Sequence, residues 1–244
     1  MSEEREALRE KLLSPRKNGY DRIKAEELQA MERYCGLYKT FLQQGKTERE
    51  CARVAVELAE KAGFKPYERG TALAAGDKIY RVNRDKSVML AVIGRESLAQ
   101  GAHIVAAHID SPRLDLKPNP LYEDSELAFF KTHYYGGIRK YQWVAIPLEL
   151  RGVVAKKDGT GEGDEAKFVI TDLLPHLGGE QGKKPLNEAV PGESLNILLG
   201  SCPSGEEDEK DRVKMRILEK LFEKYGITED DFTSAELEAV PAAQ

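Results

Sequence analysis

The sequence has few of the residues that mark secreted or membrane proteins. Cys35, Cys51 and Cys202 are odd in number, far apart and in no metal-binding spacing. This argues against disulfides or a cysteine-based zinc site and favours a reducing compartment. No apolar run approaches the ~18–20 residues of a membrane span, and the charged N-terminus has no apolar signal-peptide core. We therefore expect a cytoplasmic protein that does not cross a membrane.

The sequence also lacks an excess of positive charge. Its 244 residues include 37 Lys and Arg against 42 Asp and Glu, a net charge of −5. It therefore has no basic character of the kind that binds nucleic acid or an anionic membrane. The glycine-rich stretch Gly159–Gly163 is not followed by Lys-Ser/Thr and contains an acidic residue. We interpret it as a hairpin loop and not as a phosphate-binding loop.

Residues 1–62 show a helical pattern. Apolar residues recur every three or four positions from Leu28 to Leu42 and predict a helix with one core-facing side. Thr47, followed three residues later by Glu50, is a capping-box pattern. It predicts the start of a further helix, which should end at Gly63.

From about residue 77 the pattern becomes strand-like. Lys78–Val82 and the unbroken apolar run Val88–Ile93 predict two strands, the second buried on both faces, and His103–His108 predicts another. The prolines within 112–120 predict an interruption. Beyond them, short β-rich segments and an amphipathic helix near Asp211–Tyr225 predict a second, mostly β unit. We therefore expect an α/β fold class in two parts.

Two residues of the third predicted strand could carry chemistry. His108 and Asp110 are two positions apart, so on a strand they would face the same side. A histidine that binds zinc commonly donates its other N–H to a carboxylate. Chance alone gives 4 × 42/244, or about 0.7, such pairs among four histidines and 42 acidic residues. The pair is therefore uninformative without its surroundings.

The surroundings resemble the aspartyl aminopeptidase family of di-zinc metallopeptidases, in its bacterial form. The matching segments fall in family order along nearly the whole chain, and together they are a specific signal. They are Val105–Leu114, which contains the His-x-Asp-Ser-Pro pattern, Thr132–Ile138, Trp143, Ile146–Gly152, Leu174–Leu177 and Ser234–Glu238.

The resemblance implies a role for three residues. By analogy with the family, His108 would bind one of the two zinc ions of a complete active site. Asp110 would orient and polarise the site without binding zinc directly. His176, in the inserted domain, would reach the active site of a neighbouring subunit and hold the peptide substrate. The alternative for His176 is a surface histidine that follows a proline.

The resemblance also implies an architecture. It predicts part of an α/β/α zinc-peptidase domain over residues 1–113 and an inserted β-rich dimerisation domain over residues 114–237. Residues 238–244 would then begin the C-terminal part of the catalytic domain. Family members form homo-oligomers, so the partners expected are other copies of the chain and peptide substrates.

The sequence departs from the family in its ligand set. A two-zinc hydrolase needs a bridging carboxylate, further Asp, Glu or His ligands and a glutamate base. In the family these follow the inserted domain. The adjacent pair Glu206 and Glu207 lies in a charged run and is not a candidate. We therefore expect a truncated zinc aminopeptidase that holds one zinc ligand and is inactive alone, since zinc sites use three or four protein ligands.

Two other interpretations stay open. The chain could be a non-catalytic dimerisation or regulatory module that pairs through its β-rich domain. It could also be one half of a split enzyme, completed by a separate C-terminal half chain. In either case a half domain leaves a sheet edge and an apolar face uncovered, which predicts oligomerisation or low solubility.

Overall fold

The computed structural model describes residues 3–14, 16–156, 159–162 and 166–242. The chain divides into two compact units, residues 1–43 and 44–244, and each is described by itself. Among the described residues, no helix is both long and apolar enough to cross a membrane.

The first unit contains helix α1 (Glu3–Leu12) and nearly all of helix α2 (Ala25–Gln44). The predicted helix is therefore present, but its predicted core-facing side is not buried. Leu28 is 37% exposed and Leu42 is 49% exposed, and no described residue of α2 is buried. The periodicity indicates which side of a helix is apolar, whereas burial also requires a neighbouring element to cover that side.

The second unit begins with the capped helix that the sequence predicts. Helix α3 runs from Glu48 to Lys61, the Thr47 side chain accepts a hydrogen bond from the Glu50 backbone N–H, and the Glu50 carboxylate accepts one from the Thr47 N–H. Gly63 follows with φ +86°, a conformation that favours glycine and ends the helix. Val54 is buried on the apolar side of α3.

Three strands form a small sheet in the order β1 (Lys65–Pro66), β2 (Lys78–Asn83) and β3 (Ser87–Val92). Both expected strands are present: β2 and β3 pair antiparallel, and α3 packs against them. The prediction that this second strand is buried on both faces is wrong. Met89 is 72% exposed and Val92 is 60% exposed, because β3 lies at the edge of the sheet and α3 covers only part of it.

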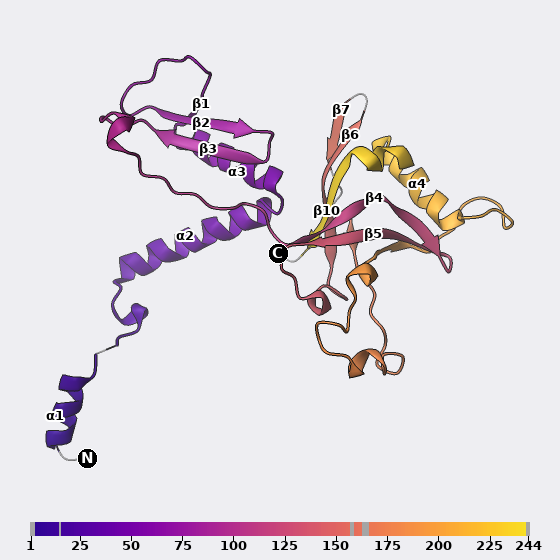
Figure 1. Ribbon diagram of the computed structural model, residues 1–244, viewed down its shortest axis with the longest axis horizontal. Helices are drawn as coiled ribbons and strands as arrows, with labels where there is room; N and C mark the ends of the chain where they lie inside the picture. The colour runs from indigo at the N-terminus through magenta and orange to yellow at the C-terminus, as the bar shows by residue number, and fades with distance from the viewer. Residues whose placement is uncertain (1–2, 15, 157–158, 163–165, 243–244) are drawn as a thin grey trace. The chain divides into compact units, whose positions relative to one another are not determined.

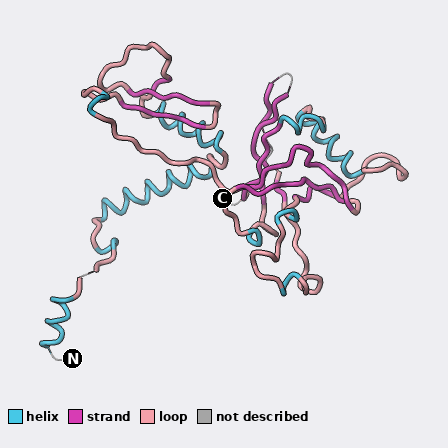
Figure 2. Tube along the Cα trace, in the orientation of Figure 1, coloured by secondary structure: helices cyan, strands magenta, loops and turns pink. Residues whose placement is uncertain are grey.

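The strand predicted at His103–His108 is absent. Residues 101–112, which we call the His108 loop, have no regular secondary structure and run as an extended segment toward β4 (Figure 2). Ile104 is 84% exposed and Val105 is fully exposed. A strand requires a hydrogen-bonded neighbour, and within the described part of the chain no strand pairs with this segment.

The second sheet contains seven strands and is antiparallel throughout. The order is β7-β6-β10-β4-β5-β9, and β8 also pairs with β6 (Figure 1). The strands are β4 (Arg113–Asp124), β5 (Leu127–Tyr135), β6 (Leu148–Lys156), β7 (Gly159–Glu162), β8 (Lys167–Phe168), β9 (Ile197–Gly200) and β10 (Ala235–Pro241).

The glycine-rich stretch forms part of the β6–β7 hairpin, with Gly159 to Glu162 paired to β6. The residue that completes the stretch, Gly163, lies outside the described residues. On the other side of β6, Gly152 has φ +133° and lies so close to β10 that a Cβ atom would stand 1.9 Å from the Glu236 carbonyl oxygen. Glycine is therefore required where these two strands meet.

Strand β4 contradicts the predicted interruption. It runs through Pro118 and Pro120, and the pairing with β5 shifts register between Leu116 and Leu121. Proline has no N–H to donate, so it is tolerated in a sheet where the hydrogen-bond ladder is already irregular.

The core lies between this sheet and helix α4 (Arg212–Tyr225), which contacts β4, β5 and β9. Val213 of α4 is buried, as its place on the predicted apolar side requires, whereas Phe222 is 62% exposed. The side chains with no exposed surface belong to the sheet and the loop before β9. They include Leu114, Leu148, Leu195 and Ile197.

Candidate functional site

The site is built around His108 and Asp110 in the His108 loop. The His108 Nδ1 atom lies 3.0 Å from the Asp110 backbone oxygen and 3.1 Å from Asp110 Oδ1. The His108 side chain is 84% exposed and that of Asp110 is 35% exposed. The two side chains meet as the sequence predicts, although the predicted strand is absent.

These contacts decide which imidazole nitrogen is free. A carbonyl oxygen and an ionised carboxylate can only accept hydrogen bonds, so Nδ1 of His108 must donate. The neutral ring then carries its proton on Nδ1, and the Nε2 lone pair remains available on an exposed side chain. This is the arrangement in which a carboxylate orients a metal-binding histidine.

Tyr135 holds the other oxygen of the Asp110 carboxylate. Its hydroxyl, at the end of β5, donates a 2.8 Å hydrogen bond to Asp110 Oδ2. This hydrogen bond is the main reason that the pKa of Asp110 is lowered, and hydrogen bonding to Asp110 raises the pKa of Tyr135. Asp110 is therefore kept as an ionised acceptor for His108.

Arg113 supports the Tyr135 ring from the neighbouring strand. The two residues are paired between β4 and β5, and the guanidinium carbon lies 4.2 Å from the ring centroid. Arg113 is buried. It donates hydrogen bonds to Glu48 at 2.8 Å and to Asp115 at 2.7 Å. Although burial opposes the charged form, these carboxylates raise the pKa of Arg113, so its charge is permanent.

A third carboxylate lies close to the same guanidinium. Glu238 Oε2 is 3.5 Å from Arg113 Nε and has no hydrogen-bond partner among the described residues. Burial, above all, raises the pKa of Glu238 to about 8, helped by the charges of Glu48 and Asp115 and opposed by Arg113. One guanidinium cannot neutralise three carboxylates, so the most buried acid keeps its proton at neutral pH.

Further ion pairs tie the start of α3 to the second sheet. Lys46 lies 2.7 Å from Glu149 of β6, Arg49 lies 2.9 Å from Glu236 of β10, and Arg151 lies 3.0 Å from Glu50. Although burial alone would raise the pKa of Glu149, Lys46 and Arg151 hold it below its ordinary value. The network therefore stabilises the packing of α3 on the strands that frame the site.

The third predicted residue, His176, lies elsewhere. It is exposed in a turn closed by hydrogen bonds from the backbone N–H groups of Leu177 and Gly178 to the Leu174 carbonyl. None of the described residues forms a hydrogen bond or ion pair with it. Glu206 and Glu207 are both exposed. Within the described part of the chain, no three His, Cys, Asp or Glu residues form a group able to hold a metal ion.

The sequence reasoning did not identify Tyr135, Arg113 or Glu238 as site residues. Tyr135 and Glu238 lie inside segments that carry the family resemblance, but no local pattern distinguishes either from its neighbours. The contact between Arg113 and Glu48 joins residues 65 positions apart. No local sequence pattern could have indicated such a contact.

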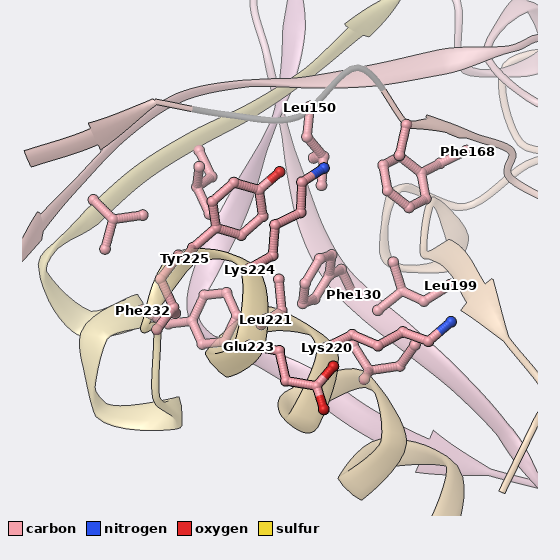
Figure 3. A pocket seen from close by; sticks show the side chains of 15 residues that line it. Phe130, Leu150, Phe168, Leu199, Lys220, Leu221, Glu223, Lys224, Tyr225 and Phe232 are labelled. Carbon is pink, nitrogen blue, oxygen red and sulfur yellow. The ribbon is translucent and has the colours of Figure 1, made fainter.

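A cavity of about 590 Å³ lies between α4 and the second sheet (Figure 3). Its lining is mainly aromatic and aliphatic and includes Phe130, Phe168 and Phe232, with Lys220, Glu223 and Lys224 from α4. Among the residues that the structure describes, no histidine, cysteine or aspartate lines the cavity. The described lining therefore contains no His–Asp pair like that of His108 and Asp110, and its ionisable side chains all come from α4.

Comparison with known proteins defines the class of the chain. Residues 41–244 match the model of the Peptidase M18 family, described as aminopeptidase I zinc metalloprotease. The match defines the family of the chain, and zinc metalloprotease is the description of that family. The chain belongs to the M18 family.

Individual relatives agree with this assignment. The probable M18 family aminopeptidase 1 of Clostridium acetobutylicum is 47% identical over 244 residues, which cover 96% of this chain and 52% of the relative. A crystal structure of an M18 aminopeptidase from Thermotoga maritima has a TM-score of 0.85 and 42% identity, covering 95% of this chain and 52% of that one. The chain thus spans about half the length of the curated relatives it matches.

More distant structures share the fold. A dodecamer of mApe1 from S. cerevisiae matches with a TM-score of 0.61 and 16% identity, over 88% of this chain and 49% of that one. The α/β fold class expected from the sequence is confirmed by the solved structures, and the family resemblance by the M18 family model.

Proposed function

We propose that this chain supplies the N-terminal half of a zinc-dependent aminopeptidase that removes N-terminal residues from peptides. The observation that carries the proposal is the His108 side chain, which is exposed, donates from Nδ1 to Asp110 and keeps Nε2 free. The proposal is also supported by the match of this chain to about half the length of an M18 family aminopeptidase, at 47% identity.

The residues present suit one part of a zinc site. His108 would bind the metal through Nε2, and Asp110 would orient the imidazole. Zinc bound there would polarise the scissile carbonyl and activate water. A tight zinc site needs three or four protein ligands, and the described residues offer no such group. We infer that the other ligands lie in the part of the relatives' length that this sequence does not span, and that these 244 residues are inactive alone.

The placement of β4 and β10 supports an inserted β-rich domain. We propose that residues 1–113 belong to the catalytic domain, 114–237 to a dimerisation domain and 238–244 to the returning catalytic domain. Strands β4 and β10 pair where the chain would enter and leave the insertion, with Asp115 opposite Glu238 and Leu114 opposite Ala239. When the two ends of an inserted domain lie side by side, the host domain can fold as one unit around the point of insertion.

We further propose that the assembled protein is a homo-oligomer that takes peptide substrates. The dodecameric assembly of a protein with this fold supports oligomerisation. His176 is the proposed residue that reaches a neighbouring subunit's substrate, because it is exposed and unengaged by described residues. Three free cysteines are in keeping with a reducing, cytoplasmic setting.

A zinc titration tests the proposal. The purified chain is stripped with chelator, supplied with zinc, desalted and assayed for zinc by elemental analysis. We expect less than one zinc ion retained per chain and no release of product from aminoacyl anilides. The proposal would be contradicted if the chain held two zinc ions tightly and turned over substrate steadily, and if His108→Ala abolished that turnover.

Complementation tests the function itself. The chain is co-expressed with the C-terminal half of the Clostridium acetobutylicum relative, and the purified complex is assayed for zinc and aminopeptidase activity. We expect activity that falls roughly 100-fold or more in His108→Ala, because loss of a ligand costs at least as much as loss of its supporting residue. His103→Ala, in the same loop, should leave activity unchanged. A complex with full activity in His108→Ala would refute the role of His108.

A specific observation favours the alternative of a non-catalytic module. The second sheet and α4 enclose a core of fully buried side chains within this chain. If light scattering shows stable dimers, while the co-expressed half neither binds nor restores activity, the module is the better description.

A further inference from the structure

The Asp110 carboxylate is held at both of its oxygens by residues from different parts of the chain. Oδ1 accepts from His108 Nδ1 at 3.1 Å and Oδ2 accepts from the Tyr135 hydroxyl at 2.8 Å. The His108 loop has no strand partner in the described part of the chain. The Tyr135 hydroxyl is therefore the link that ties this carboxylate to a sheet.

The Tyr135 ring is itself firmly placed. It belongs to the last residue of β5, opposite Arg113 in β4, and the Arg113 guanidinium stacks on the ring at 4.2 Å. Arg113 is 7% exposed and donates hydrogen bonds to Glu48 and Asp115. The Tyr135 hydroxyl is thus anchored by a buried ion-pair cluster and a regular sheet. The atoms of these elements move much less than those of an exposed loop.

The neighbouring tyrosine does not share this arrangement. Tyr134 stacks with His133 at a centroid distance of 5.3 Å and lies against Gly192. Only one of two adjacent tyrosines therefore contacts Asp110, and the other provides a matched control.

We propose that Tyr135 is a positioning residue that orients the Asp110 carboxylate, so that His108 holds its proton on Nδ1 and presents Nε2. This inference rests on the proposed role of His108 as a metal ligand. Tyr135 touches neither the metal nor the substrate. It links the β4–β5 pair to the Asp110 carboxylate in a loop that has no strand partner among the described residues.

The test measures the tautomer of His108 in the metal-free chain. Histidine is labelled with ¹⁵N, the four imidazoles are assigned with single His→Gln variants, and spectra are recorded about two units above the ordinary histidine pKa. We expect the Nδ1–H tautomer to dominate in the wild type. Tyr135→Phe keeps the ring and its stacking on Arg113 but loses the hydroxyl. It should move the tautomer ratio toward Nε2–H on the order of fivefold, the effect of one modest hydrogen bond.

Two further variants make the result decisive. Tyr134→Phe should leave the ratio unchanged, and Asp110→Asn should move it at least as far as Tyr135→Phe does. An unchanged ratio in Tyr135→Phe overturns the proposal, as does an equal change in Tyr134→Phe. The buried fluorophore Trp143 reports whether each variant keeps the fold.

The measurement separates this inference from the proposed function. Because no metal is added, a failure of the chain to bind zinc leaves the tautomer ratio interpretable. In the co-expressed complex, Tyr135→Phe should lower zinc affinity by about 10-fold, the lower end of the effect of removing a residue that supports a ligand. Zinc affinity that is unaltered while the tautomer ratio shifts would overturn the link between Tyr135 and metal binding.

Discussion

The two sheets of the second unit differ in how fully their apolar residues are covered. In the three-stranded sheet, Met89 and Val92 of β3 are 72% and 60% exposed. In the seven-stranded sheet, Leu114 and Leu148 have no exposed surface. Yet Met89 and Val92 belong to an unbroken apolar run, whereas the residues that follow Leu114 and Leu148 alternate between charged and apolar. The difference shows that a hydrophobic pattern predicts a strand, whereas burial depends on what else packs against it.

The largest expected effect compares the two sheets directly. Leu148→Ala removes a fully buried side chain from the core of the second sheet and should lower the free energy of unfolding by about 3 kcal/mol. Met89→Ala, on the exposed side of β3, should change it by less than about 0.5 kcal/mol. Urea unfolding followed by the fluorescence of Trp143, which lies in the same core as Leu148, measures both.

Equal losses in the two variants would contradict this comparison. They would show that β3 is buried in solution, for example against a second copy of the chain. A repeat at tenfold lower protein concentration distinguishes that case, because stabilisation by association depends on concentration.

The second effect concerns Glu238, the buried acid of β10 that lies near Arg113. The pKa of Glu238 is raised to about 8 from an ordinary value of 4.5. Below pH 4.5 the group is protonated in both folded and unfolded chains. Between the two values only the folded chain keeps the proton, so stability falls as pH rises toward 8. The loss between pH 6 and 8 should be about 2 kcal/mol, at 1.36 kcal/mol per pH unit.

Glu238→Gln mimics the protonated acid and should abolish this slope. Urea midpoints at pH 6, 7 and 8 measure it. Glu236→Gln is the control: although burial alone would raise the pKa of Glu236, Lys86 and Arg49 hold it below its ordinary value, so it does not titrate in this range. A wild-type slope that survives in Glu238→Gln would assign it to another group.

The smallest effect concerns the helix that packs on the first sheet. Thr47→Ala removes the hydroxyl that accepts from the Glu50 N–H at the start of α3. It should cost about 1 kcal/mol of unfolding free energy, the usual value for an N-cap. Thr71→Ala, in an exposed loop before β2, should have an effect within about 0.5 kcal/mol. If both variants unfold at the same urea concentration, the first sheet and α3 unfold separately from the core that Trp143 reports.

Local patterns predicted much of the fold. The capping box at Thr47 and Glu50 and the helix ending at Tyr225 are present as expected. Each depends on residues a few positions apart, where side-chain spacing and backbone preference are sufficient. The order of motifs along the chain was also enough to predict the family, since it needs only the sequence.

The candidate site shows what local patterns cannot supply. The pairing of His108 with Asp110 could be predicted because the two residues are two positions apart. The Tyr135 hydroxyl arrives from 25 positions away, and the Glu48 carboxylate reaches Arg113 across 65. The sequence by itself therefore determined the family, the helices and the ligand candidate. The tertiary structure alone decided which tyrosine holds Asp110, which acid keeps its proton and which strand stays exposed. These depend on the distances between distant segments and on how far burial removes each group from water.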